Sequence, residues 1–399
     1  MAGTSGFSVS GYGPERGIWA TIAARDSLAR RLDWPLMFSA IALSAVGSLL
    51  VWSATRNRTD LNGGDPYHFF LRHILNTGIG LALMIGTIWL GHRTLRGAVP
   101  VLYGLSVVLV LLVLTPLGAT INGAHAWIVI GGGFTLQPSE FVKITIILGM
   151  AMMLAARVDA GDQVHPDHRT VAKSLGLAVV PIVIVMMMPD LGSVMVMAVI
   201  VLGVLLASGA SNRWIFGLVG AGVVGAVAVA ALGILDEYQI NRFAAFANPE
   251  LDPAGVGYNT NQARIAIGSG GLTGTGLFKG SQTTGQFVPE QQTDFVFTVA
   301  GEELGFLGAG LILLLLGVVL WRACRIARET TELYGTIVAA GIIAWFAFQS
   351  FENVGMTLGI MPVAGLPLPF VSYGGTSMFA VWIAVGLLQS IRVQKPMSA

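Results

Sequence analysis

The sequence predicts an all-α, polytopic membrane protein with about ten transmembrane helices. Hydrophobic residues make up 54% of the 399 residues and charged residues only 11%, whereas a soluble domain carries about 25% charged residues. Apolar runs such as 101–114 and 307–320 are continuous, and each belongs to a segment near the ~20 residues that a helix needs to cross a bilayer. A transmembrane β-barrel would instead alternate apolar and polar residues at every second position.

The apolar segments divide the chain into one membrane domain and two short tails. The chain begins with a Gly- and Ser-rich stretch that lacks the basic-then-apolar order of a cleaved signal peptide. We therefore expect a disordered cytoplasmic tail at 1–33, a single transmembrane domain at 34–391 and a cytoplasmic tail at 392–399. The expected spans are 34–54, 68–91, 95–117, 137–156, 171–189, 191–209, 213–234, 294–321, 333–358 and 369–391.

The distribution of basic residues sets the orientation. With both termini inside, 15 of the 22 Lys and Arg residues fall on the cytoplasmic side, as the positive-inside rule requires. The long loop at 235–293, between the seventh and eighth spans, is then extracytoplasmic. It carries aromatic residues and an amphipathic run at 261–271, so we expect short helices that lie on the membrane surface.

Composition also excludes several classes of function. The net charge of +1 argues against a nucleic-acid partner. Cys324 is the single cysteine, so the chain has no internal disulfide and no cysteine metal cluster. The glycines at 268–276 form neither a P-loop nor a dinucleotide fingerprint, and we predict no metal-ligand group.

Polar residues cluster at the start of the fourth span. Gln137, Glu140 and Lys143 are three residues apart and share one helix face. The pair of Glu140 and Lys143 either satisfies itself inside the bundle or lines a polar cavity. The preceding segment at 122–133 is predicted to be re-entrant, with Trp127 near the cavity mouth, although an interfacial tryptophan is also a common anchor.

Three carboxylates accompany the eighth span. Asp294 stands at its start, where helix capping alone could explain it. Glu302 and Glu303 would lie about 12–14 Å further along the same helix, which capping cannot explain. These acids predict a polar cavity that faces outward, in either a transporter or a membrane-embedded enzyme.

Further polar residues interrupt other spans. Asp190 is placed to cap the sixth span. Glu352 and Asn353 lie within the ninth span, and the Pro- and Gly-rich break at 367–377 follows it. Broken backbone at membrane depth is tolerated where it lines protein or a wet cavity.

Several motifs together resemble the SEDS family (shape, elongation, division and sporulation), which includes RodA and FtsW. The motifs are NGAHAWIVIGGGFTLQPSEFVKI, MMPDLGS, ANPELDPAGVGYNTNQARIAIGSGGLTGTGLFKGSQ, FVPEQQTDFVFTVAGEELGFLG and NVGMTLGIMPVAGLPLPFVSYGGTS. The loop before Asp294 is more similar to RodA than to FtsW. Val288 and Gln292 depart from the family's usual Leu and His, which leaves any proton-transfer role of that histidine unfilled, while Glu290 is kept.

The resemblance implies a peptidoglycan glycosyltransferase in the plasma membrane. Such a protein polymerises lipid II on the outer face during cell elongation, with a class B penicillin-binding protein as transpeptidase partner, other elongation proteins and membrane lipids around it. Asp294 matches the family's essential carboxylate and would act as general base in an inverting displacement. The donor is activated by its pyrophosphate, so no ATP site is required.

The leaving pyrophosphate requires positive charge. The candidates are Arg242, Arg264 and Lys279 in the loop, with Lys143 at the cavity wall, and a divalent cation (Mg or Mn) could share this role. Ser372 of the last motif joins the substrate-side residues. Two alternatives remain open: a lipid II flippase that uses Glu302, Glu303 and Lys143, and a non-catalytic scaffold of a cell-wall synthase.

Overall fold

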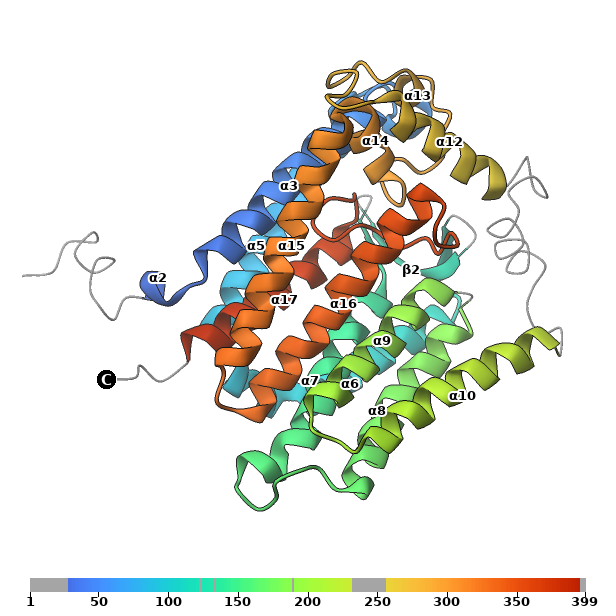
Figure 1. The fold of residues 1–399 in the computed structure, drawn as a ribbon. Helices are drawn as coiled ribbons and strands as arrows, with labels where there is room; N and C mark the ends of the chain where they lie inside the picture. Colours follow the sequence, from blue (N-terminus) through green and yellow to red (C-terminus); the bar gives the residue numbers. More distant parts are fainter. Residues whose placement is uncertain (1–27, 122–123, 132–133, 189, 232–255, 395–399) are drawn as a thin grey trace, which may run out of the picture.

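The computed structural model describes residues 28–121, 124–131, 134–188, 190–231 and 256–394. Long helices form an elongated bundle, with the short helices of residues 256–303 gathered at one end (Figure 1). The bundle contains α3 (Trp34–Thr55), α5 (His68–Leu90), α6 (His92–Val113), α7 (Pro138–Asp159), α8 (His168–Met186), α9 (Leu191–Ala207), α10 (Asn212–Ala231), α15 (Gly305–Glu329), α16 (Leu333–Leu358) and α17 (Gly375–Val393). The short helices are α2 (Leu28–Arg31), α4 (Thr59–Asn62), α12 (Val256–Ser269), α13 (Ser281–Thr284) and α14 (Val296–Glu303).

The predicted all-α polytopic architecture is confirmed. Within the described residues, eight helices are long and apolar enough to cross a membrane. The helix α9 is apolar but only 17 residues long, and α10 occupies the expected seventh span. Helices α7, α16 and α17 are the most enclosed, and α17 packs along α5 while α16 packs along α9.

The predicted eighth span at 294–321 is not one helix. The helix α14 ends at Glu303, and α15 starts at Gly305, whose φ of 67° lies in the left-handed region. Figure 1 shows α14 beside α12 and α13 at the end of the bundle, from where α15 runs back along α3. The prediction that Glu302 and Glu303 lie deeper than Asp294 is therefore wrong. We call residues 256–303, which include α12, α13 and α14, the cap.

Backbone pairing fixes this reversal. The N–H groups of Thr275 and Gly276 donate to the carbonyls of residues 302 and 303 at 3.0 and 3.1 Å, and Phe306 N–H donates to the carbonyl of residue 271 at 2.9 Å. A Cβ at Gly274 would lie 2.1 Å from the carbonyl oxygen of residue 303, and its φ is 82°. The glycine-rich stretch at 268–276 thus permits close backbone packing in the cap.

The carboxylates of α14 hold the cap together. Glu302 accepts hydrogen bonds from the Thr283 N–H (2.9 Å) and hydroxyl (2.7 Å). Glu303 accepts from Ser53 Oγ, at the end of α3, at 2.6 Å. Short helices in the long loop are confirmed by α12 and α13, while residues 235–255, including Arg242, lie outside the described part of the chain.

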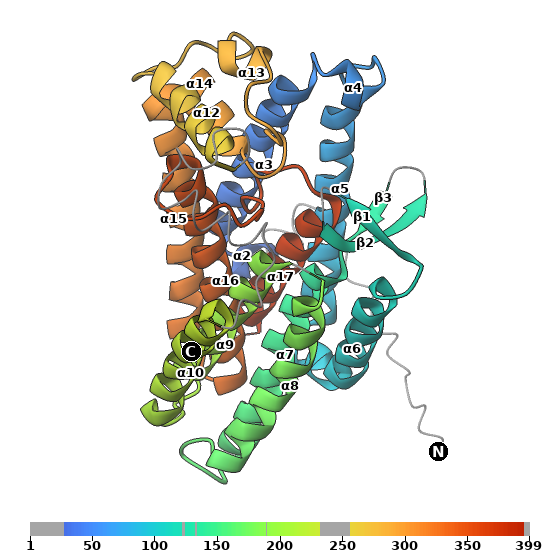
Figure 2. The same cartoon turned by 90° about the vertical axis from the view of Figure 1, so that its right-hand side faces the viewer.

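The segment at 122–133 is predicted to be re-entrant, but its described residues, 124–131, form a strand of a small antiparallel sheet. Its strands are β1 (Gly118–Ile121), β2 (Ala124–Gly131) and β3 (Phe134–Leu136), in the order β1-β2-β3. Strand pairing satisfies backbone groups that a re-entrant coil would leave without partners. Figure 2 shows the sheet at the ends of α6 and α7, on the side of the bundle away from α15.

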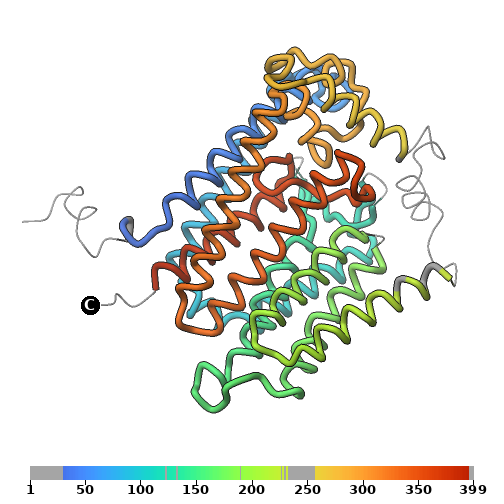
Figure 3. Tube along the Cα trace, viewed as in Figure 1, coloured from blue at the N-terminus to red at the C-terminus, as the bar shows by residue number. Residues whose placement is uncertain are grey.

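A buried ion pair joins the start of α3 to α15 at the opposite end from the cap, where Figure 3 shows the two described chain ends close together. Asp33 is 1% exposed and caps α3 through the Leu36 N–H. Its carboxylate binds Arg322 at 2.8 and 2.6 Å, and its backbone exchanges two hydrogen bonds with Gln389. Ordered structure thus includes Leu28–Arg31 and Asp33, inside the stretch expected to be a tail.

The close packing in the cap predicts that Gly274→Ala destabilises the protein by about 1–3 kcal/mol, because the new methyl group overlaps a carbonyl oxygen. Gly268→Ala is the matched control, since nothing lies within 4 Å of its added Cβ and alanine favours the helix. Thermal unfolding of the two purified variants in detergent tests this. Equal unfolding temperatures would contradict the close packing.

Candidate functional site

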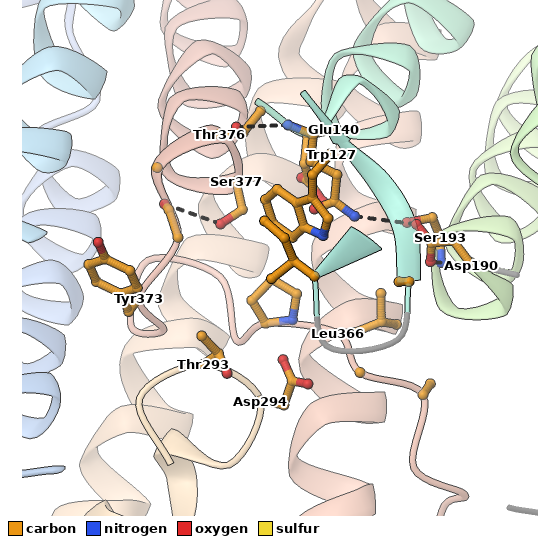
Figure 4. A pocket seen from close by; sticks show the side chains of 18 of the residues that line it. Trp127, Glu140, Asp190, Ser193, Thr293, Asp294, Leu366, Tyr373, Thr376 and Ser377 are labelled. Atoms are coloured by element: carbon orange, nitrogen blue, oxygen red, sulfur yellow. Dashed lines mark hydrogen bonds between the residues drawn. The ribbon is translucent and has the colours of Figure 1, made fainter. Parts of the chain in front are cut away.

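A polar cavity of about 170 Å³ lies where the sheet, the cap and the loop before α17 meet. Five parts of the chain form its wall: the β1–β2 hairpin, the start of α7, the start of α9, the segment before α14, and the stretch at 364–377 that leads into α17. Figure 4 shows the labelled side chains around it. The lining residues are Ile121, Ala124, Trp127, Gln137, Glu140, Asp190, Leu191, Ser193, Thr293, Asp294, Ala364, Gly365, Leu366, Pro367, Tyr373, Gly374, Gly375, Thr376 and Ser377.

Asp294 belongs to a segment whose backbone is held by three hydrogen bonds in succession. The carbonyl of residue 292 accepts from the Tyr373 N–H at 2.8 Å, and that of residue 293 accepts from the Ser372 hydroxyl at 2.5 Å. The carbonyl of Asp294 itself accepts from Asn353 Nδ2 at 2.8 Å. We call these three contacts the carbonyl cradle. They leave the Asp294 side chain to point into the cavity (Figure 4).

Two residues predicted on the substrate side have other contacts. Glu290 accepts hydrogen bonds from Gln292 Nε2 and Thr293 Oγ1, both at 3.2 Å, and so closes its own turn. Ser372 donates to the cradle and accepts from the Leu368 N–H at 2.8 Å. Neither of them lines the cavity, and both shape the segments that do.

Asp190 connects two helices at the cavity wall. Its Oδ1 accepts from the Ser193 N–H at 3.0 Å, which confirms the predicted cap of α9. Its Oδ2 accepts from Gln137 Nε2 at 3.3 Å, and the Gln137 N–H donates to Thr376 Oγ1 at 3.1 Å. The sequence suggested only capping for Asp190; its exposure to the cavity depends on α9 packing beside α7.

The sequence left open whether Glu140 and Lys143 pair with each other inside the bundle or line a polar cavity. In the structure they pair, and one of them also lines the cavity. They are 1% and 0% exposed, and Lys143 Nζ lies 2.7 Å from Glu140 Oε1. Lys143 also donates to Gln349 Oε1 at 3.2 Å and sits 4.8 Å from the Trp345 ring centroid. Glu140 lines the cavity but Lys143 does not, so the lysine neutralises the glutamate from behind.

The predicted phosphate-binding residues do not converge on the cavity. Arg264 and Lys279 are exposed on the cap and do not line it. A cation that sequence reasoning did not select, Arg72 near the start of α5, hydrogen-bonds the Tyr373 phenol. Burial raises the pKa of Tyr373, and Arg72 partly offsets this shift. The sequence did carry one sign of this cation: a basic residue near the start of the expected span at 68–91.

The cavity chemistry suits a hydroxyl-rich ligand. Glu140, Asp190 and Asp294 supply carboxylate acceptors, several hydroxyl groups stand between them, and Trp127 supplies an aromatic face. No Lys or Arg is among the described lining residues. Across the described part of the chain, no three His, Cys, Asp or Glu side chains are arranged to hold a metal ion.

Fold and site together define a polytopic membrane protein with a carboxylate-lined cavity at one end of its bundle. The FtsW/RodA/SpoVE family model, described as "Cell cycle protein", matches residues 34–396. The chain belongs to this family.

Individual relatives agree over nearly the whole chain. Stage V sporulation protein E of Bacillus subtilis (strain 168) is 36% identical over 360 residues, which cover 90% of this chain and 96% of that protein. Peptidoglycan glycosyltransferase MrdB of Escherichia coli (strain K12) is 34% identical, covering 92% and 95%. A solved chain from "Structural coordination of polymerization and crosslinking by a peptidoglycan synthase complex" has a TM-score of 0.73 and 31% identity, covering 92% and 99%.

The buried pair at the cavity wall predicts that Lys143→Met destabilises the protein by about 3–5 kcal/mol, because Glu140 loses its cationic partner while it stays buried. The double variant Glu140→Gln, Lys143→Met should recover most of this loss. Arg325→Met is the control: its i,i+4 partner Glu329 is partly exposed, so the change should cost about 1 kcal/mol or less. Unfolding temperatures in detergent measure all three, and an unrecovered double variant would contradict the pairing.

Proposed function

We propose that this chain is a peptidoglycan glycosyltransferase that polymerises lipid II into glycan strands on the outer face of the plasma membrane. The observation that carries the proposal is the Asp294 carboxylate, which a fixed backbone presents to a polar cavity. Membership of the family and the activity named for MrdB support the reaction class.

The reaction follows from this geometry. Asp294 accepts the proton of the acceptor's 4-hydroxyl as that oxygen attacks the anomeric carbon of the donor sugar. The bond from that carbon to the pyrophosphate oxygen breaks, and undecaprenyl pyrophosphate leaves with the electron pair. One displacement inverts the α donor bond to the β product bond, so no covalent enzyme intermediate is needed. Glu140 and Asp190 accept hydrogen bonds from sugar hydroxyls, and Trp127 packs against the sugar.

The leaving pyrophosphate places negative charge beside the cavity. Arg72 hydrogen-bonds the phenol of Tyr373, which lines the wall. Its planar guanidinium can form paired hydrogen bonds with phosphate oxygens. We assign this role to Arg72, in place of Arg264 and Lys279.

The charge distribution supports an outward-facing cavity. The cavity shares the cap end of the bundle with α12 and α13, which belong to the loop that the positive-inside rule places outside. The Arg-rich ends of α6, α15 and α17, with Arg93, Arg96, Arg322, Arg325 and Arg392, lie at the other end.

A transpeptidase partner of the penicillin-binding-protein class is part of the proposal. Its support is the likeness to a chain of a peptidoglycan synthase complex that couples polymerisation and crosslinking. A role in elongation rather than division stays a prediction.

The flippase alternative loses its proposed residues. Glu302 and Glu303 bind Thr283 and Ser53 within and beside the cap, and Lys143 is fully buried against Glu140. They do not line a shared path through the bundle. The scaffold alternative leaves the three cavity carboxylates without a role.

Asp294→Asn should abolish polymerisation, with a loss of at least about 10²–10⁴-fold, because the amide cannot accept the proton. The measurement is polymerisation of labelled lipid II by the purified protein, with and without its transpeptidase partner. Asp60→Asn, an exposed carboxylate near the end of α3, is the matched control and should remain active. Full activity of a folded Asp294→Asn variant would remove Asp294 from the mechanism, and an inactive wild type that moves lipid II across vesicles would favour the flippase.

Arg72→Ala should lower kcat/KM for lipid II about tenfold, because one charge-assisted contact with the pyrophosphate is lost. Tyr373→Phe distinguishes the role of Arg72 from that of its tyrosine partner. This change removes the phenol hydroxyl but keeps Arg72, so the decrease in kcat/KM should be smaller. Lys279→Ala serves as the exposed-cation control on the cap. The assignment of Arg72 is wrong if Lys279→Ala reduces kcat/KM as much.

A further inference from the structure

We propose that Asn353 is a positioning residue for the general base: its side-chain amide sets the place of Asp294 by binding two walls of the cavity at once. This inference rests on the proposed function, in which Asp294 takes the acceptor proton.

The contacts of Asn353 are specific to a side-chain amide. Asn353 is on α16 and is 0% exposed. Its Nδ2 donates to the carbonyl oxygen of Asp294 at 2.8 Å and to that of Leu366 at 2.7 Å. An amide nitrogen carries two hydrogens, so both are used. One buried group therefore joins the Asp294 segment to residue 366 of the 364–367 loop, 72 positions later in the sequence, and both stretches line the cavity.

The helix that presents Asn353 is itself fixed at the same level. Gln349 lies one turn earlier on the same helix face and donates Nε2 to the carbonyl of Pro367 at 2.7 Å. Its Oε1 accepts from Trp345 Nε1 at 2.7 Å and from Lys143 Nζ at 3.2 Å. Two amides on one face of α16 thus hold adjacent carbonyls of the 364–367 loop, and a buried lysine orients one of these amides.

The hydrogen bond from Asn353 to Asp294 affects the carboxylate more directly than the other two contacts of the carbonyl cradle. It acts on the peptide group of the catalytic residue itself, one bond from the Cα that carries the carboxylate side chain. A rotation of that peptide group moves the carboxylate relative to the acceptor oxygen. Misplacement of a reacting group by about 1 Å can cost about 100-fold in rate, whereas the cavity walls that bind the sugar would remain in place.

The test compares two asparagines with the same chemistry. Asn62 also donates Nδ2 to two carbonyls, those of Thr55 and Arg56, at 3.0 and 3.2 Å, and is 5% exposed. It does not line the cavity. Asn353→Asp and Asn62→Asp both replace the donor with a carboxylate that repels the two carbonyls, so both should lower the unfolding temperature.

The expected result is a difference in turnover. Asn353→Asp should lower kcat for lipid II polymerisation about 100-fold and leave KM within about threefold of wild type, because positioning is lost and binding is kept. Asn62→Asp should keep the wild-type kcat. The milder Asn353→Ser, which retains one donor, should give an intermediate kcat, and it keeps the test decisive if Asn353→Asp does not fold.

A second readout is independent of activity. Amide hydrogen exchange in residues 290–295 and 364–373 should accelerate in the folded Asn353 variants and stay unchanged in Asn62→Asp. If wild type polymerises and folded Asn353→Ser matches its kcat, or if KM alone rises, the inference is overturned. If wild type is inactive while the exchange difference is present, the proposed function fails and the structural linkage by Asn353 stands.

Discussion

The docking of residues 292–294 onto residues 372–373 and α16 is the constraint on which the cavity depends. Three carbonyls in a row are bound by donors from Tyr373, Ser372 and Asn353. The segment leads into α14, so the same contacts anchor the cap to the bundle. A side chain on a connecting segment would otherwise be mobile; here three consecutive hydrogen bonds hold the backbone that carries Asp294.

Two buried ion pairs lie where separate elements of the structure meet. Glu140 and Lys143 pair at the cavity wall, and Asp33 pairs with Arg322 at the far end of the bundle. Because an unpaired charge inside a membrane costs about 2.5–3.5 kcal/mol on insertion scales, such pairs restrict how the helices can assemble. The pair at the wall has a second consequence: the lysine holds the Glu140 carboxylate at the edge of the cavity without itself lining the cavity.

Much of the fold could be predicted, because the apolar length that a bilayer requires is written locally in the chain. The spans at 34–54, 68–91 and 333–358 agree with α3, α5 and α16 within a few residues. The failures have a common cause. The reversal at Gly305 and the sheet at 118–136 depend on backbone hydrogen bonds between separate segments, and an apolar run such as 294–321 carries no sign of them.

The sequence by itself determined the membrane class, the order of the spans and the presence of Asp294, Glu140, Gln137 and Trp127 at a polar site, because apolar length and polar residues at helix starts are local properties. Only the tertiary structure decided what these residues touch. The role of Asn353, the position of Lys143 behind Glu140 and the turn of α14 away from the bundle all depend on which carbonyl or carboxylate arrives opposite. That is a property of the packed chain, since every residue carries the same carbonyl group.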